Sequence, residues 1–236
     1  MLLFAVATLL AAIAACVQGT IGFGLALTSA PLLALLDPAF VPGPLLIASL
    51  PLALAALARE RGHADVHGVL TAFAGRVPGT VLGALAVAAL PVLFLHVTIG
   101  LLVLLGVAVS VWAPHFQPTR RVLLGAGVIS GVTGTVAAIG GPPVALVYQH
   151  ASGPRIRATL AMYFALGTLL SVVALTVTGS FGRHEAVLSA ILLPGTVIGF
   201  LASGPVLKVV DAGRIRPLVL GAAVLSAIVL LATALL

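Results

Sequence analysis

Charged side chains are scarce in this sequence. Asp, Glu, Lys and Arg together make up 7% of its 236 residues, whereas 61% of the residues are hydrophobic and the mean hydropathy is +1.31. One water-soluble core cannot bury so much apolar surface, so the composition predicts an integral membrane protein that lies in the lipid bilayer. The net charge of +6 comes from few residues, and no stretch remains for a soluble basic domain, so nucleic-acid binding is not expected.

Cysteine and buried acidic residues are also limited. The single cysteine, Cys16, excludes an intramolecular disulfide and a multi-cysteine metal site, and we expect it to be an apolar filler. All acidic residues fall at the ends of apolar segments, so the buried carboxylate of many proton or sodium couplers is missing. These residues are Asp37, Glu60, Asp65, Glu185 and Asp211.

The remaining chemical signals argue against an enzyme. The six histidines lie near segment ends, where each is expected to be a boundary residue rather than a metal ligand or proton carrier, with His150 as the best placed exception. The sequence contains no P-loop and no arrangement of nucleophile, base and acid. We therefore expect no enzymatic activity, no metal and no cofactor.

Apolar runs divide the chain into eight candidate membrane segments. They are 2–36, 40–58, 68–90, 92–113, 121–150, 156–178, 186–207 and 217–236. Six of them are close to the roughly 20 residues that a spanning helix needs. The other two are too long for one span, and each contains a glycine-rich break, QGTIGFG at 18–24 and TGTVAAIGGPP at 133–143. We expect each long segment to consist of two arms joined at its break.

The sequence repeats itself. Gly19-Thr20 aligns with Gly134-Thr135 at an offset of 115 residues, and PGTVLG at 78–83 recurs as PGTVIG at 194–199 at an offset of 116. Two matches at nearly the same offset predict an internal duplication, with one repeat over 1–113 and another over 114–236. Together the two repeats would form one transport domain.

The distribution of positive charge distinguishes two topologies. If each broken segment crosses the membrane once, the repeats are parallel and the loop Lys and Arg residues divide five against five. If each is a re-entrant hairpin, the repeats are inverted, and one side carries nine of these residues against Arg183 alone on the other. The nine are Arg59, Arg61, Arg120, Arg121, Arg155, Arg157, Lys208, Arg214 and Arg216.

The bias of nine to one favours the hairpins, because positive loops stay in the cytoplasm. We therefore predict an all-α integral membrane protein of two inverted repeats, each a broken helical hairpin followed by three transmembrane helices. We expect the protein to lie in the cell inner (plasma) membrane, with both termini outside the cytoplasm. The cytoplasmic loops would be 59–67, 114–120, 151–155 and 208–216.

The two breaks have a physical use at membrane depth. Irregular backbone is tolerated there where it lines a cavity or is buried in protein, and glycine lets a ligand approach the bare backbone. Pro142 and Pro143 suit the first turn of a helix. The arms that start near Gly24 and Gly141 would point their free N–H groups at the membrane interior from opposite sides, which favours an anion. The alternative is that these glycines only permit close helix packing.

Both breaks lie in stretches that carry a family resemblance. GTIGFGLALTSAPLL at 19–33 and GVTGTVAAIGGPPVALVYQHASGPRIRATL at 131–160 resemble the paired signatures of the sulfite exporter TauE/SafE family, a glycine-rich turn followed by a Pro-containing helix in each half. The first departs from the family's usual glycine doublet, because it reads Gly22-Phe23-Gly24. The resemblance covers essentially the whole chain and implies multi-pass transport of sulfite, thiosulfate, sulfonates or related small organic acids.

Arg76 is the remaining polar signal. It lies about nine residues inside its segment, about 13 Å from the cytoplasmic end, so it is part of an anion site, a snorkelling side chain or a side chain held by backbone carbonyls. Gly75, Gly79 and Gly83 share one helix face, as do Gly195 and Gly199, which predicts close helix contact along both faces. The matched Thr80 and Thr196 offer hydroxyls either to a ligand or to their own helix.

We therefore predict a secondary transporter that moves a small sulfur-containing anion, as an exporter, by alternating access to a site between the two broken hairpins. The predicted substrate-binding residues are Gln18, Gly19, Thr20, Gly22, Phe23, Gly24, Arg76, Thr80, Thr133, Gly134, Thr135, Gly140, Gly141, Pro142, Pro143 and Thr196. Coupling to protons and a homodimer stay open. The alternative function is a non-transporting membrane scaffold or partner subunit.

Overall fold

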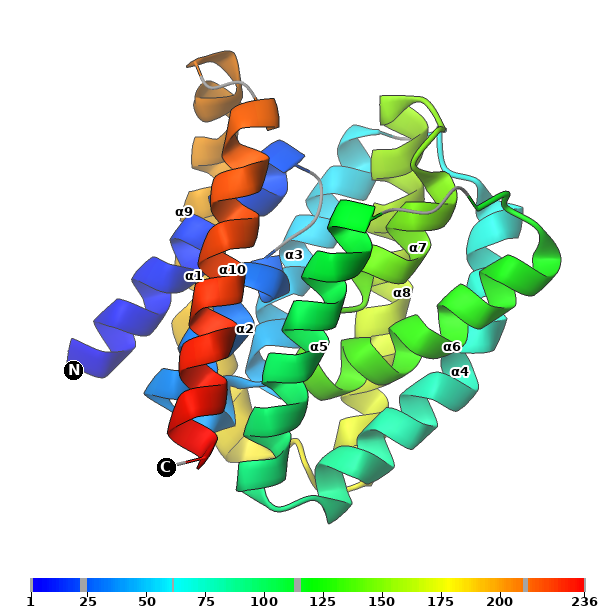
Figure 1. The fold of residues 1–236 in the computed structure, drawn as a ribbon. Helices are drawn as coiled ribbons and strands as arrows, with labels where there is room; N and C mark the ends of the chain where they lie inside the picture. Colours follow the sequence, from blue (N-terminus) through cyan, green and yellow to red (C-terminus); the bar gives the residue numbers. More distant parts are fainter. Residues whose placement is uncertain (1, 22–24, 61, 113–115, 210–211, 236) are drawn as a thin grey trace.

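The computed structural model describes residues 2–21, 25–60, 62–112, 116–209 and 212–235, and every regular element in these ranges is a helix (Figure 1). The elements are α1 (Leu2–Ile21), α2 (Leu25–Leu36), η1 (Pro38–Phe40), α3 (Gly43–Arg59), α4 (Val66–Ala89), α5 (Val92–Trp112), α6 (Arg120–Ala137), α7 (Gly141–Tyr148), α8 (Gly153–Val177), α9 (Arg183–Val209) and α10 (Ala212–Leu235). Seven helical stretches within these ranges are long and apolar enough to cross a membrane. The predicted all-α integral membrane protein is confirmed.

Both long segments are broken into two helices, as expected. The first gives α1 and α2, and its break, Gly22 to Gly24, lies outside the described residues. In the second, α6 ends at Ala137, and Ala138 adopts the left-handed conformation with φ 59°. Pro142 and Pro143 lie in the first turn of α7, where their missing N–H groups leave no hydrogen bond unmade.

The arms of each broken segment return to the end from which they came (Figure 1). In that view α1 rises from the lower end and α2 descends again, whereas α6 descends from the upper end and α7 rises again. The following helices α3, α4 and α5 run up, down and up, and α8, α9 and α10 run down, up and down. Corresponding helices of the two halves therefore run in opposite directions.

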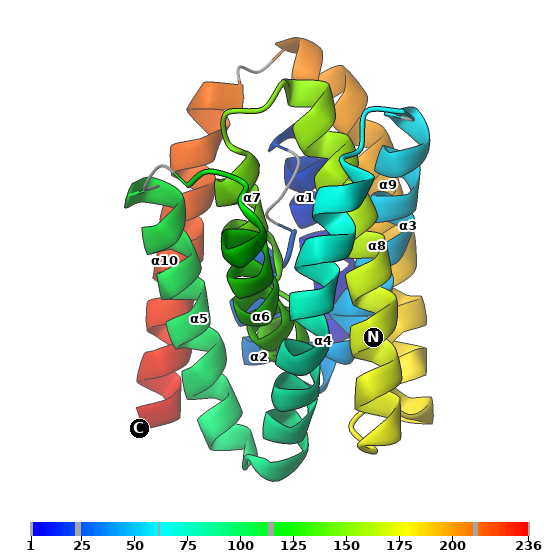
Figure 2. The same ribbon diagram turned by 90° about the vertical axis from the view of Figure 1, so that its right-hand side faces the viewer.

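The halves pack against each other through matched helix pairs. The first helix of each half lies along the fourth helix of the other, because α4 packs on α6 and α9 packs on α1. Figure 2 shows a further pair, α5 beside α10. Because α4 packs on α6 and α8 of the second half, one face of α4 is buried between the two halves.

Glycines allow the closest of these contacts. A Cβ atom at Gly75 or Gly79 would collide with the backbone carbonyls of Leu124 or Val128 in α6. Gly195 and Gly199 lie in the same way against α1. The prediction of close helix contact along these faces is confirmed.

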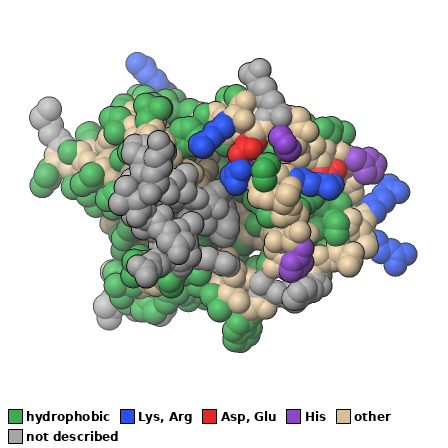
Figure 3. Space-filling model, turned by 90° about the horizontal axis from the view of Figure 1, so that it is seen from above, with side chains coloured by type: hydrophobic (Ala, Val, Ile, Leu, Met, Phe, Trp, Pro, Cys, Tyr) green, Lys and Arg blue, Asp and Glu red, His purple; other side chains and the backbone are tan. Residues whose placement is uncertain are grey.

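The upper end of the molecule carries most of its described charged and histidine side chains. Figure 3 views this end from above and shows Lys, Arg, Asp, Glu and His side chains gathered on it. The two ion pairs among the described residues join Arg155 to Asp65 and Arg157 to Glu60 there. The boundary between the two predicted repeats, at residues 113 and 114, stays a prediction.

Candidate functional site

The centre of the site is Arg76, a charged side chain with only 2% of its surface exposed. Three glycines make room for its guanidinium group. A Cβ atom at Gly134 would lie 2.9 Å from Nη2, one at Gly140 would lie 3.1 Å from Nη1, and one at Gly167 would collide with Cζ. Because these glycines come from α6, the break and α8, Arg76 lies where three segments meet.

The contacts of Arg76 are with neutral groups. Its Nη1 donates a hydrogen bond of 3.3 Å to Ser130 Oγ, and its Cζ lies 5.0 Å from the centroid of the Tyr163 ring, within cation–π range. Its Nε has no hydrogen-bond partner among the described residues. No described carboxylate pairs with it, since both described ion pairs lie at the upper end. The positive charge of Arg76 is therefore not balanced by the described part of the protein.

A cavity of about 50 Å³ lies beside this guanidinium and meets the first residues of both α2 and α7. Its polar lining side chains are those of Arg76, Gln18, Ser49 and Thr168, and Leu25, Gly140 and Gly141 line it at the two helix starts. The start of a helix presents unpaired N–H groups and a positive end of the helix dipole. Two helix starts and one arginine on the same cavity favour an anion.

Hydroxyl groups of α6 hold the break in place. Ser130 Oγ donates to the Gly140 carbonyl at 2.5 Å, and Thr133 Oγ1 donates to the Ile139 carbonyl at 2.8 Å. The carbonyls of the break therefore point back to α6. Because Ser130 also accepts from Arg76, it ties the arginine to the same turn.

The other break has a different arrangement. Gln18 Oε1 accepts a hydrogen bond of 3.1 Å from the Leu25 N–H, so this side chain caps the start of α2. Gln18 also lines the cavity, and its amide nitrogen is a hydrogen-bond donor. The two sides of the cavity are therefore chemically unequal, with an arginine and a glycine turn on one side and a glutamine on the other.

A wider vestibule connects this cavity to the upper end of the molecule. The vestibule has a volume of about 230 Å³ and shares Gln18, Ala53 and Phe164 with the smaller cavity. Arg59 and Arg157 line it near the upper end, together with Glu60, which forms an ion pair of 2.7 Å with Arg157. Because Glu60 pairs with Arg157, these three side chains together carry one net positive charge.

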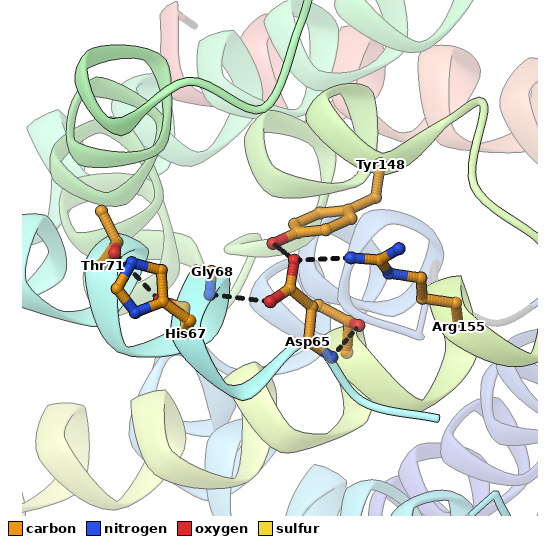
Figure 4. Close-up of polar contacts among 7 residues, drawn as sticks. Asp65, His67, Gly68, Thr71, Tyr148 and Arg155 are labelled. Atoms are coloured by element: carbon orange, nitrogen blue, oxygen red, sulfur yellow. Dashed lines mark hydrogen bonds and ion pairs between the residues drawn. The ribbon is translucent and has the colours of Figure 1, made fainter. Parts of the chain in front are cut away.

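Asp65 joins three helices at the same end of the molecule (Figure 4). Its Oδ1 accepts from the Gly68 N–H at 3.0 Å, and its Oδ2 accepts from Tyr148 Oη and Arg155 Nη2, both at 3.1 Å. The hydrogen bond from Gly68, followed by the contacts with Arg155 and Tyr148, holds the pKa of Asp65 below its usual value, against the opposing effect of burial. Asp65 thus fastens the start of α4 to the end of α7 and to α8.

This network predicts a pH dependence. A carboxylate whose pKa is lowered by folding stabilises the protein above its unfolded pKa, and that contribution is lost as the pH falls through the lower, folded pKa. We expect the melting temperature of the wild-type protein in detergent to fall between about pH 5 and pH 3, and Asp65→Asn to melt lower at pH 7 with a flatter profile over that range. Glu185→Gln is the control, since Glu185 lies at the lower end. Equal pH profiles for wild type and Asp65→Asn would contradict the assignment.

The structure gathers part of the predicted site. The predicted residues that line the small cavity are Gln18, Arg76, Gly140, Gly141 and Pro142. Gly134 lies against the guanidinium, and Thr133 holds the break. Gly19 lies on the vestibule and against Ser203 of α9. Whether these residues bind substrate stays a prediction.

Other predicted residues lie away from the cavity or outside the described part. Thr196 Oγ1 donates to the Leu193 carbonyl of its own helix, Thr135 pairs with Ser171 at 2.9 Å, and Thr80 is buried without lining either cavity. Pro143 lies in the first turn of α7 and is not among the lining residues. The residues outside the described part are Gly22, Phe23 and Gly24, together with the side chain of Thr20.

Sequence reasoning missed four contributors to the site: Ser130, Tyr163, Phe164 and Gly167. Ser130 lies one helical turn before Gly134, so the spacing to a predicted residue could have indicated it. Tyr163 is one of only two tyrosines and lies inside an apolar segment, which is also a usable signal. Nothing in the sequence around Gly167 distinguishes it from a packing glycine.

Comparison with known proteins gives one match. Residues 7–230 match the sequence model of the sulfite exporter TauE/SafE family. No curated protein and no solved structure matches the chain. The match spans the chain from α1 into α10 and includes the cavity, the vestibule and both breaks.

Proposed function

Because the chain belongs to the sulfite exporter TauE/SafE family, it is a multi-pass membrane transporter rather than an enzyme, and we propose that the Arg76 cavity is its substrate site. The observation that carries this proposal is a buried arginine whose charge no described carboxylate balances, on the same cavity as two helix starts. The substrate is a small sulfur-containing anion, such as sulfite, thiosulfate or a sulfonate, or a related organic acid. Such an anion supplies the negative charge that the cavity favours.

We further propose that the site is exposed alternately to the two sides of the membrane. The vestibule leads from the upper end to the small cavity through shared residues. A third cavity, of about 550 Å³, lies at the lower end and includes Asp37, His96 and Glu185; it shares no lining residue with the small cavity. This arrangement supports a state that is open only toward the upper end.

The opposed directions of the two halves support the proposal that they are inverted repeats with re-entrant hairpins. In such transporters a site forms where discontinuous helices from the two repeats meet, and one repeat moves against the other. The upper end is assigned to the cytoplasm, because the loops at this end are those predicted to be cytoplasmic, with nine of the ten Lys and Arg residues of the loops. Substrate that enters the vestibule from the cytoplasm and leaves at the lower end would be exported.

This sidedness can be measured by cysteine labelling. In a Cys16→Ser background, single cysteines would replace Gln117, Ser152 or His184, all exposed in the structure. An impermeant maleimide applied to intact cells should label position 184 alone, and should label 117 and 152 only in inverted vesicles. The control for background labelling is the cysteine-free protein under the same conditions. Labelling of 117 and 152 from opposite faces would contradict the hairpin of α6 and α7.

Flux in liposomes tests the function itself. Purified protein would be reconstituted and loaded with radiolabelled sulfite, or with a short alkyl sulfonate, and the release of label compared with that from protein-free liposomes. We expect protein-dependent release that is lost with Arg76→Gln. A correctly folded protein that releases neither anion under any external medium would instead favour the alternative function, a membrane scaffold or partner subunit.

A further inference from the structure

The charge of Arg76 bears on how a transporter of this kind is coupled. We propose that the Arg76 cavity binds a small inorganic anion such as chloride whenever it does not hold substrate, so that the protein exchanges one anion for another instead of releasing substrate alone. This inference rests on the proposed function, because it concerns the same cavity. It goes further in naming a second ligand and the mode of coupling.

The first step is that Arg76 cannot lose its charge. A buried lysine or histidine can become neutral by releasing a proton, whereas a guanidinium group stays protonated in proteins. Arg76 is 2% exposed and lies in the middle of α4, so it cannot reach the membrane surface with its charged end. The side chain therefore remains a cation inside the protein and needs a negative partner.

The second step is that the surrounding protein offers hydrogen-bond donors instead of negative charge. The guanidinium donates a hydrogen bond to the Ser130 hydroxyl and lies against the Tyr163 ring, and no carboxylate in the described ranges pairs with it. The carbonyls of Ile139 and Gly140 are engaged by Thr133 and Ser130. The starts of α2 and α7 lie on the same cavity and add the positive ends of their helix dipoles, although Pro142 and Pro143 carry no N–H group and the Leu25 N–H is bonded to Gln18.

The third step is size. The cavity of about 50 Å³ exceeds the roughly 10–15 Å³ that a cavity needs in order to hold one water molecule. It accommodates a monatomic anion or the charged group of a small oxyanion. Gluconate is a much larger anion, and we expect the cavity to exclude it.

These steps determine which states can reorient. A protein that changes its exposed side with substrate or chloride bound moves a nearly neutral site through the membrane interior. Without any anion, the same movement carries an unbalanced cation, which is unfavourable in a medium of low dielectric constant. Reorientation is therefore fast when an anion is bound and slow when none is bound, which makes the transporter an exchanger.

The experiment uses liposomes that contain the wild-type protein and radiolabelled sulfite. Potassium and valinomycin hold the membrane potential at zero, so that charge movement does not limit the flux. The external anion is sulfite, chloride or gluconate. We expect release into gluconate to be at least about tenfold slower than release into either small anion, because the return step lacks a ligand.

Each outcome has one meaning. Equal release into gluconate and chloride would overturn the exchange while leaving the proposed transport function intact. Release into sulfite but not into chloride would overturn the claim that an inorganic anion other than substrate fills the cavity. Absence of release into all three media would contradict the proposed function itself.

A stability measurement locates the chloride. Replacing gluconate by chloride should raise the melting temperature of the detergent-solubilised wild type by about 3 °C, because a ligand that binds the folded state stabilises it. Gly125→Ala should show the same rise, since a Cβ atom at Gly125 meets nothing within 4 Å. Arg76→Gln should show none. An equal rise in Arg76→Gln would move the anion away from Arg76 and overturn the inference.

Discussion

Arg76→Gln is expected to weaken sulfite binding by about 100-fold, because the substitution removes the one full positive charge among the described residues that line the cavity while keeping a side chain that forms hydrogen bonds. Arg76→Lys should restore the charge and recover about tenfold of this loss. An ammonium group lacks the planar pair of donors that matches an oxyanion, so recovery is incomplete. The order of affinities should therefore be Arg, then Lys, then Gln.

The thermal stability of Arg76→Gln is expected to rise although its affinity for sulfite falls. In gluconate, where no small anion balances the cation, Arg76→Gln is expected to melt at a higher temperature than the wild type, because a buried unpaired charge is removed. A side chain that serves only to hold α4, α6 and α8 together would give the reverse, since its loss would lower the melting temperature. The two measurements together thus separate a binding role from a structural one.

The affinities would be measured by titration calorimetry in detergent, with gluconate as the background anion. Gly125→Ala serves as the control for mutation of a residue with no neighbour within 4 Å. Unchanged affinity in a folded Arg76→Gln protein would leave the anion to the two helix starts and would remove Arg76 from the site.

The helical organisation could be predicted from the sequence because its signals are local. Charge and proline mark the ends of the segments sharply, so the run predicted over 92–113 corresponds to α5, Val92–Trp112. The break before Pro142 and Pro143 was predictable for the same reason, since their ring geometry fixes where a helix can begin. The break is shorter than the glycine-rich stretch at 133–143, because α6 continues to Ala137, three residues before Gly140, and α7 begins at Gly141.

The site was only partly predictable because it depends on contacts between distant segments. The repeated motifs PGTVLG and PGTVIG suggested paired ligands at Thr80 and Thr196, yet their glycines pack α4 on α6 and α9 on α1. A duplication copies packing contacts as faithfully as binding residues, so the repeat alone could not separate the two. Tyr163 and Gly167 lie 87 and 91 residues from Arg76 in the sequence, and only the packing of α8 on α4 brings them together.

Gly167 provides the second large effect. A Cβ atom there would collide with the Arg76 guanidinium carbon, so Gly167→Ala must displace the guanidinium from its place beside Ser130. A misplacement of about 1 Å in a binding group can lower a rate about 100-fold. We expect sulfite release from liposomes to fall by about tenfold to 100-fold in Gly167→Ala, and to stay near the wild-type rate in Gly125→Ala.

A double-mutant cycle connects this effect to Arg76. Lysine lacks the branched end with which the new methyl group collides, so Arg76→Lys should cost less in the Gly167→Ala background than in the wild type, and the two changes should not be additive. Melting temperatures of all four proteins show whether each remains folded. If the two substitutions lower transport independently, Gly167 acts through the packing of α8 and not through the position of the guanidinium group. If they are coupled, the glycine is present in α8 because the arginine of α4 needs the space that a side chain would fill.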